Sequence, residues 1–105
     1  MEPRALGVGV VWCPELDALC RESEGLVDVI EAEPETFWIP TLNAQEFRSF
    51  LSGALEHLTQ PKLLHGVGGP VGGTCPSPTG YLEAFARDVA ALNPEYVSEH
   101  LSVTQ

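Results

Sequence analysis

Two histidines, His65 and His100, are the residues whose type and spacing most clearly indicate chemistry. Each stands near the end of a short apolar segment, and Glu31 ends an earlier segment at a similar interval. In parallel α/β folds the carboxyl ends of the strands converge on one face, where active sites form. Neighbouring strands lie about 4.8 Å apart, so two imidazoles at matched strand ends could reach one cation. Either histidine alone suits a hydrogen-bonded structural role, whereas the pair makes a shared metal or catalytic site an equal alternative.

Three further residues could support such a site. Glu31 could ligate a metal, act as a base or hold an imidazole in place, although a surface carboxylate is equally consistent with the sequence. Ser98 and Glu99 immediately precede His100 and could contribute to the pocket. Because side chains alternate across a strand, Ser98 shares the face of His100 and Glu99 takes the opposite one. A Ser98-Glu99-His100 catalytic relay is therefore excluded.

Gly66 begins a glycine-rich loop, GVGGPVGG, which matches neither common phosphate-binding motif. Its glycines would let the backbone pass close to whatever the adjacent site binds, so Gly66 is also a candidate pocket residue. His57 falls on the polar side of a predicted helix and is expected to be solvated. Glu33 and Glu35, in an acidic loop, are expected to be surface charges.

Hydrophobic periodicity predicts four strands that alternate with three helices. The strands are expected at residues 6–12, 26–31, 62–67 and 96–101, and the helices at residues 15–22, 47–58 and 82–92. The second helix has the clearest apolar stripe, consisting of Phe47, Phe50, Leu51, Ala54, Leu55 and Leu58. The stripe of the third helix consists of Leu82, Phe85, Ala86, Val89 and Leu92.

Apolar strands that alternate with helices favour an α/β fold with a parallel sheet and right-handed crossovers. The nearly equal strand-to-strand intervals suit a parallel (β/α) barrel of the TIM type. Such a barrel needs about 250 residues. The 105 residues of this chain are therefore expected to form a single partial domain, the amino-terminal half barrel.

Composition narrows the range of partners. Fifteen acidic and five basic residues give a formal net charge of -10, which disfavours nucleic acid and anionic membrane surfaces. No apolar run approaches the roughly 20 residues of a membrane span, and no signal peptide is recognisable at the start, so a cytoplasmic location is expected. Three cysteines without CxxC spacing are expected to be free thiols.

The segments GLVDVIEAEP, LLHGVGGPVGG and YVSEHLS resemble those of the multinuclear non-haem iron-dependent oxidases, which include the oxidase of methanobactin biosynthesis. The resemblance runs from about Leu6 to the end of the chain and covers the first four strands of that family. It implies a TIM-type barrel that binds two or three iron ions and uses dioxygen to modify residues, often cysteines, of ribosomally made peptides. His65 and His100 match metal ligands of the family, and Glu31 matches an acidic position near the site.

The resemblance also implies partners: a ribosomally made precursor peptide and a peptide-recognition protein. After His65 this chain reads Gly-Val-Gly-Gly-Pro-Val-Gly, where many members have Gly-Val-Gly-Leu-Ser-Leu-Gly, which indicates a different subfamily. The ligands that the family takes from strands five to eight are not among these residues. We therefore expect weak iron binding and no turnover by this chain alone, with self-association through open strand edges.

Two other functions are compatible with the same residues. A metal-dependent sugar isomerase or endonuclease of similar barrel architecture also places His and Glu at strand ends. A non-catalytic half-domain could instead bind a partner along an open strand edge.

Overall fold

A parallel sheet of four strands forms the centre of the structure, a computed structural model that describes residues 5–22, 25–42, 46–67 and 80–99. The strands are β1 (Gly9–Val11), β2 (Val29–Ala32), β5 (Lys62–Gly66) and β6 (Tyr96–Glu99). They lie in the order β1-β2-β5-β6, and each neighbouring pair is parallel. This arrangement confirms the predicted α/β class and parallel sheet. The closure of the sheet into a barrel is not visible in these four strands.

In the part of the chain that the structure describes, three α-helices and two short 3-10 helices connect the strands. They are η1 (Pro14–Leu16), α1 (Asp17–Glu22), η2 (Pro34–Phe37), α2 (Leu51–Leu55) and α3 (Tyr81–Leu92). Pro14 lies in the first turn of η1, where its missing N–H costs no hydrogen bond. Asn93 ends α3 in the left-handed conformation, with φ 49°, and its N–H donates to the Val89 carbonyl.

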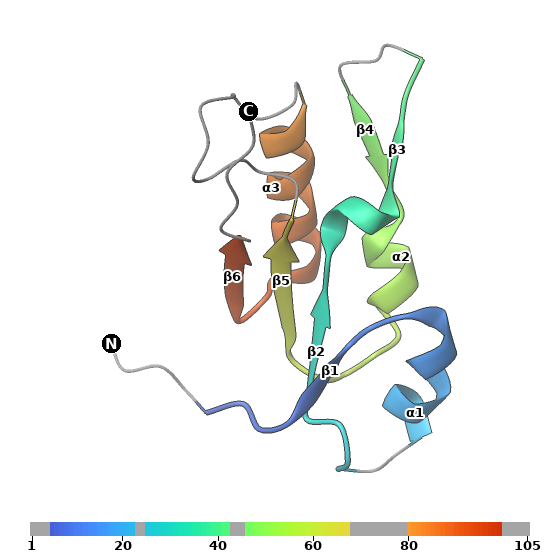
Figure 1. Cartoon of the computed structure of the whole chain (residues 1–105), viewed down its shortest axis with the longest axis vertical. Helices are drawn as coiled ribbons and strands as arrows, with labels where there is room; N and C mark the ends of the chain where they lie inside the picture. The colour runs from blue at the N-terminus through green and yellow to red at the C-terminus, as the bar shows by residue number, and fades with distance from the viewer. Residues whose placement is uncertain (1–4, 23–24, 43–45, 68–79, 100–105) are drawn as a thin grey trace.

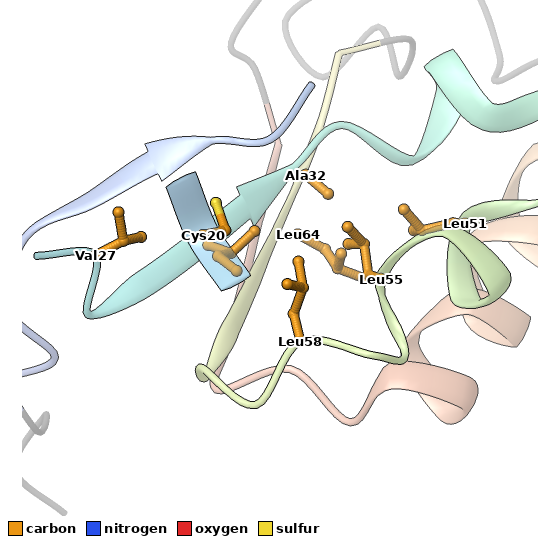
Figure 2. Close-up of a cluster of buried hydrophobic side chains, with 8 residues drawn as sticks. Cys20, Val27, Ala32, Leu51, Leu55, Leu58 and Leu64 are labelled. Carbon is orange, nitrogen blue, oxygen red and sulfur yellow. The ribbon is translucent and has the colours of Figure 1, made fainter. Parts of the chain in front are cut away.

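The core lies on one side of the sheet. Ile30, Ala32 and Leu64, from the two central strands, are completely buried there. The side chains around them come from all three α-helices and the segments beside them: Cys20, Val27, Leu51, Leu55, Leu58, Phe85, Val89 and Leu92. Figure 2 shows Leu55 and Leu58 directed toward Leu64, with Cys20 close by. The helices therefore cover one face of the sheet, and we call the opposite face the inner face.

The predicted helix over residues 47–58 is wrong at both ends. Residues Phe47–Ser49 form strand β4, which pairs antiparallel with β3 (Trp38–Pro40), and only Leu51–Leu55 are α-helical. The Phe50 N–H donates to the Phe37 carbonyl at 3.0 Å. Residues 37–40 thus supply a pairing partner that helical periodicity cannot reveal. In Figure 1 this hairpin extends beyond the carboxyl ends of β5 and β6.

Two other sequence expectations need correction. The strand predicted at residues 6–12 spans only Gly9–Val11, and Val8 and Val11 are exposed because β1 lies at the edge of the sheet. On α3, Leu82 and Ala86 of the predicted stripe are exposed, whereas Tyr81, Ala84 and Asp88 are buried. The helix is rotated toward the hairpin, with which it shares contacts. Within the described residues, no helix is long and apolar enough to cross a membrane.

Candidate functional site

His65 points to the inner face of the sheet. It is paired in register with Ser98 on β6, and the imidazole Nδ1 lies 2.7 Å from the Ser98 Oγ. The preceding residue, Leu64, is buried on the helix side, as alternation along a strand requires. Strands β5 and β6 therefore bring together two of the predicted site residues from segments that are distant in sequence.

Glu31 lies on the neighbouring strand β2 and faces the same side. Its register partners are Val11 on β1 and Leu63 on β5. Glu31 therefore lies beside Leu63, which is two residues before His65 on β5. Glu31 borders a shallow open cavity of about 200 Å³ on the inner face, lined also by Gly9, Val10, Val11, Val29 and Leu63. The inner face thus presents a carboxylate and an imidazole on adjacent strands.

The second predicted ligand, His100, lies outside the described residues, as do residues 68–73 of the glycine-rich loop. Over residues 5–22, 25–42, 46–67 and 80–99, no group of three or more His, Cys, Asp or Glu side chains is placed to hold a metal ion. The described part of the site consists of His65, Ser98 and Glu31.

Glu35 does not behave as the plain surface charge that the sequence indicated. Its Oε2 atom accepts the backbone N–H of Val67 at 2.6 Å and the hydroxyl of Tyr81 at 2.9 Å. Glu35 lies in η2, just after β2, and Val67 directly follows β5. The carboxylate therefore joins the carboxyl ends of the two central strands.

Glu99 occupies the helix side of the sheet, opposite His65. Its Oε2 atom accepts a hydrogen bond of 2.8 Å from the hydroxyl of Tyr81. Burial is the main cause that raises the pKa of Tyr81 well above its usual value, and the hydrogen bonds to Glu99 and Glu35 add to it. Each neighbouring negative charge disfavours the phenolate, so the Tyr81 hydroxyl remains a hydrogen-bond donor.

Gly66, the last residue of β5, is placed directly against this group. A Cβ atom on Gly66 would overlap the Glu99 carboxylate and would lie 2.7 Å from the Tyr81 hydroxyl and 2.8 Å from the Phe85 ring. A larger residue would therefore force these side chains to shift, because the backbone of Gly66 packs against the carboxylate and the hydroxyl. The expected role of Gly66, to let the backbone pass close to a bound group, stays a prediction.

Asp88 forms a second buried polar group between the hairpin and α3. Its side chain is 3% exposed, and it accepts hydrogen bonds from Trp38 Nε1 at 2.7 Å and from Ser49 Oγ at 2.6 Å. The Trp38 ring packs edge-on against Tyr81 and Phe85, with centroid distances of 5.4 and 6.4 Å. Asp88 thus links the hairpin to the helix that carries Tyr81.

His57 is exposed, as expected, but its Nε2 lies 2.8 Å from Asp17 Oδ1. Asp17 also accepts hydrogen bonds from Trp12 Nε1 at 3.1 Å and Arg21 Nε at 2.9 Å. The hydrogen bond from Arg21 is the main cause that lowers the pKa of Asp17. This surface cluster ties α1 to the segment after α2 and takes no part in the inner-face site.

Sequence patterns assigned no role to Tyr81 or Asp88, and they indicated only a surface charge for Glu35. Glu35 and Asp88 look like ordinary surface carboxylates because their hydrogen-bond donors are distant in sequence. The only available signal was indirect: Trp38 and Tyr81 carry polar atoms that need partners when their rings are buried.

The chain matches a family model described as RiPP precursor modification enzyme MbnB/TglH/ChrH over residues 7–105. No curated protein and no solved structure matches it. The family match covers nearly the whole chain and agrees with the resemblance seen in the strand-end motifs. The chain belongs to the MbnB/TglH/ChrH family of enzymes that modify the precursors of ribosomally synthesised peptides.

Proposed function

We propose that this chain forms the amino-terminal portion of an iron-dependent oxidase that uses dioxygen to modify residues, often cysteines, of ribosomally made precursor peptides. The family supports the peptide as substrate. The observation that carries the metal site is the placement of His65 on the inner face, with its Nδ1 2.7 Å from Ser98 Oγ.

The chemistry of these side chains fits iron. Non-haem iron that reacts with dioxygen is commonly held by two histidines and one carboxylate. In the proposed site, His65 on β5 and His100, the residue that follows β6 in the sequence, are ligands. Glu31 is a carboxylate on the inner face that either binds the metal or orients a ligand. Because Ser98 bonds to Nδ1, the ligating nitrogen of His65 would be Nε2. Bound iron would supply the activation of dioxygen.

We also propose that the four-stranded sheet is the first half of a TIM-type barrel. Among the described residues, its helices cover one face, and the inner face still exposes apolar side chains such as Val11. Strands β1 and β6 form open edges of the sheet within the described residues. A further set of parallel strands would cover this face and close these edges. Without such strands, the open edges favour self-association of the chain. A separate peptide-recognition protein would present the precursor peptide to the enzyme.

The test compares His65→Ala with the matched control His57→Ala, a histidine on the opposite side of the fold. Anaerobic titration with ferrous iron measures binding. Mass spectrometry measures the oxygen-dependent mass change of a cysteine-containing precursor peptide. Both measurements are made on this chain and on a version extended to full barrel length.

We expect weak iron binding and no peptide modification by this chain, and both activities in the extended version. His65→Ala should abolish them there, whereas His57→Ala should leave them unchanged. Equal iron loading and turnover by the two lengths would contradict the half-barrel proposal. Full activity of His65→Ala would contradict the assignment of the ligand.

A further inference from the structure

The carboxyl ends of β5 and β6 are held together by three side chains, Glu35, Tyr81 and Glu99, which we call the strand-end clasp. Glu35 Oε2 accepts the Val67 N–H at 2.6 Å, and the Tyr81 hydroxyl bonds to Glu35 at 2.9 Å and to Glu99 at 2.8 Å. The clasp therefore connects the segment after β2, the end of β5, the start of α3 and the end of β6.

The hydroxyl of Tyr81 is held in place by the packing of its ring. Tyr81 is 4% exposed, and its ring centroid lies 5.4 Å from that of Trp38 and 5.9 Å from that of Phe85. Aromatic contacts of this kind hold the ring with little freedom. The hydroxyl is thus held in one place, and its single O–H is shared between two carboxylates on different elements.

The clasp lies on the helix side of the sheet and packs against Gly66, the residue that follows His65 on β5. Gly66 has no space for a Cβ because Glu99 and Tyr81 pack against its backbone. Alternation along β5 places His65 on the inner face and the next position on the helix side. A shift of the clasp would therefore move the backbone on which the imidazole is mounted.

We propose that Glu35 and Tyr81 are positioning residues for the inner-face site, a proposal that rests on the proposed function. By bonding the Val67 N–H and the Glu99 carboxylate, they fix the spacing between the ends of β5 and β6. That spacing sets the contact between His65 Nδ1 and Ser98 Oγ. Functional side chains need to be held within about 0.5 Å of their working geometry, which requires a supporting layer of this kind.

The test uses Tyr81→Phe, which keeps the ring and removes the hydroxyl, together with Glu35→Gln and Glu35→Ala. Glu35→Gln keeps an oxygen that can accept the Val67 N–H, so it serves as the conservative rescue. Glu83→Gln, an exposed carboxylate in the first turn of α3, is the matched control. Nitrogen NMR of the His65 ring at constant pH reports its tautomer and environment, and hydrogen exchange reports the Val67 amide. Neither measurement requires iron.

Loss of a hydrogen bond to a charged acceptor should accelerate exchange of the Val67 amide by about tenfold or more in Glu35→Ala. We expect Glu35→Gln to restore most of the protection and Glu83→Gln to behave as the parent chain. The ring signals of His65 should change in Tyr81→Phe and in Glu35→Ala. Iron affinity, where the extended version binds iron, should fall by about 10- to 100-fold.

Unchanged His65 signals in folded Tyr81→Phe, together with unchanged signals in Glu35→Ala if it folds, would overturn the positioning role. Altered His65 signals in the variants, together with no iron binding by the extended version of the parent protein, would support the clasp and contradict the proposed metal site. The two failures are therefore distinguishable.

Discussion

Asp88 on α3 is the carboxylate whose removal should most clearly weaken the attachment of the β3–β4 hairpin. It is 3% exposed and accepts hydrogen bonds from Trp38 Nε1 at 2.7 Å and Ser49 Oγ at 2.6 Å. Each hydrogen bond to a charged acceptor contributes about 1.5–3 kcal/mol. We expect Asp88→Ala to lower the free energy of unfolding by about 3–6 kcal/mol, since both donors lose their partner.

The contribution of the Trp38 bond can be isolated by a double-mutant cycle. The cycle combines Trp38→Phe, which removes the N–H but keeps an aromatic ring, with Asp88→Ala. Because each single variant already breaks the bond, the double variant should be less destabilised than the sum, by about 1.5–3 kcal/mol. Urea unfolding followed by circular dichroism measures all four proteins.

Two controls separate the hydrogen bonds from general damage to α3. Asp88→Asn keeps one acceptor oxygen and the shape of the side chain, so it should cost only about half as much as Asp88→Ala. Glu83→Ala, an exposed position on the same helix, should change stability by less than about 0.5 kcal/mol. A coupling energy indistinguishable from zero between Trp38 and Asp88 would refute this reasoning.

Three further predictions concern the strand-end clasp and the surface cluster. Gly66→Ala should destabilise the chain by about 1–3 kcal/mol in urea unfolding, because its Cβ would overlap the Glu99 carboxylate; equal stability of the two proteins would contradict the close packing. The raised pKa of Tyr81 stabilises the folded state fully below the unfolded tyrosine pKa of about 10, and this contribution is lost as the pH rises above it. Ultraviolet absorbance should show the same phenolate signal in the parent chain and in Tyr81→Phe until the protein unfolds, because Tyr81 stays protonated in the folded state. A smaller signal in the variant would contradict the raised pKa of Tyr81. The lowered pKa of Asp17 stabilises the folded state above the unfolded aspartate pKa of about 3.9 and is lost as the pH falls through the folded value. Carbon NMR should show the Asp17 pKa rising in Arg21→Gln, and no change would exclude the arginine as its main cause.

Local sequence patterns were sufficient to predict the parallel sheet. Short apolar segments alternate with helical stripes, and right-handed crossovers then leave few topologies. The alternation of Leu64 and His65 across β5 predicted which side chain enters the core and which faces inward, and Leu64 is buried as required. The family resemblance followed from residues close to these same strand ends and was confirmed by the match over residues 7–105.

The hairpin and the clasp depended on tertiary structure. Helical periodicity is a property of one segment, whereas the strand at Phe47–Ser49 exists because residues 38–40 pair with it. Glu35 and Asp88 differ from surface carboxylates only through donors that are separated from them by 32 to 50 residues along the chain. A hydrogen-bond partner at such separation leaves no local periodicity, so the burial and role of these acids were decided by the packing of η2, the hairpin and α3 around the end of the sheet.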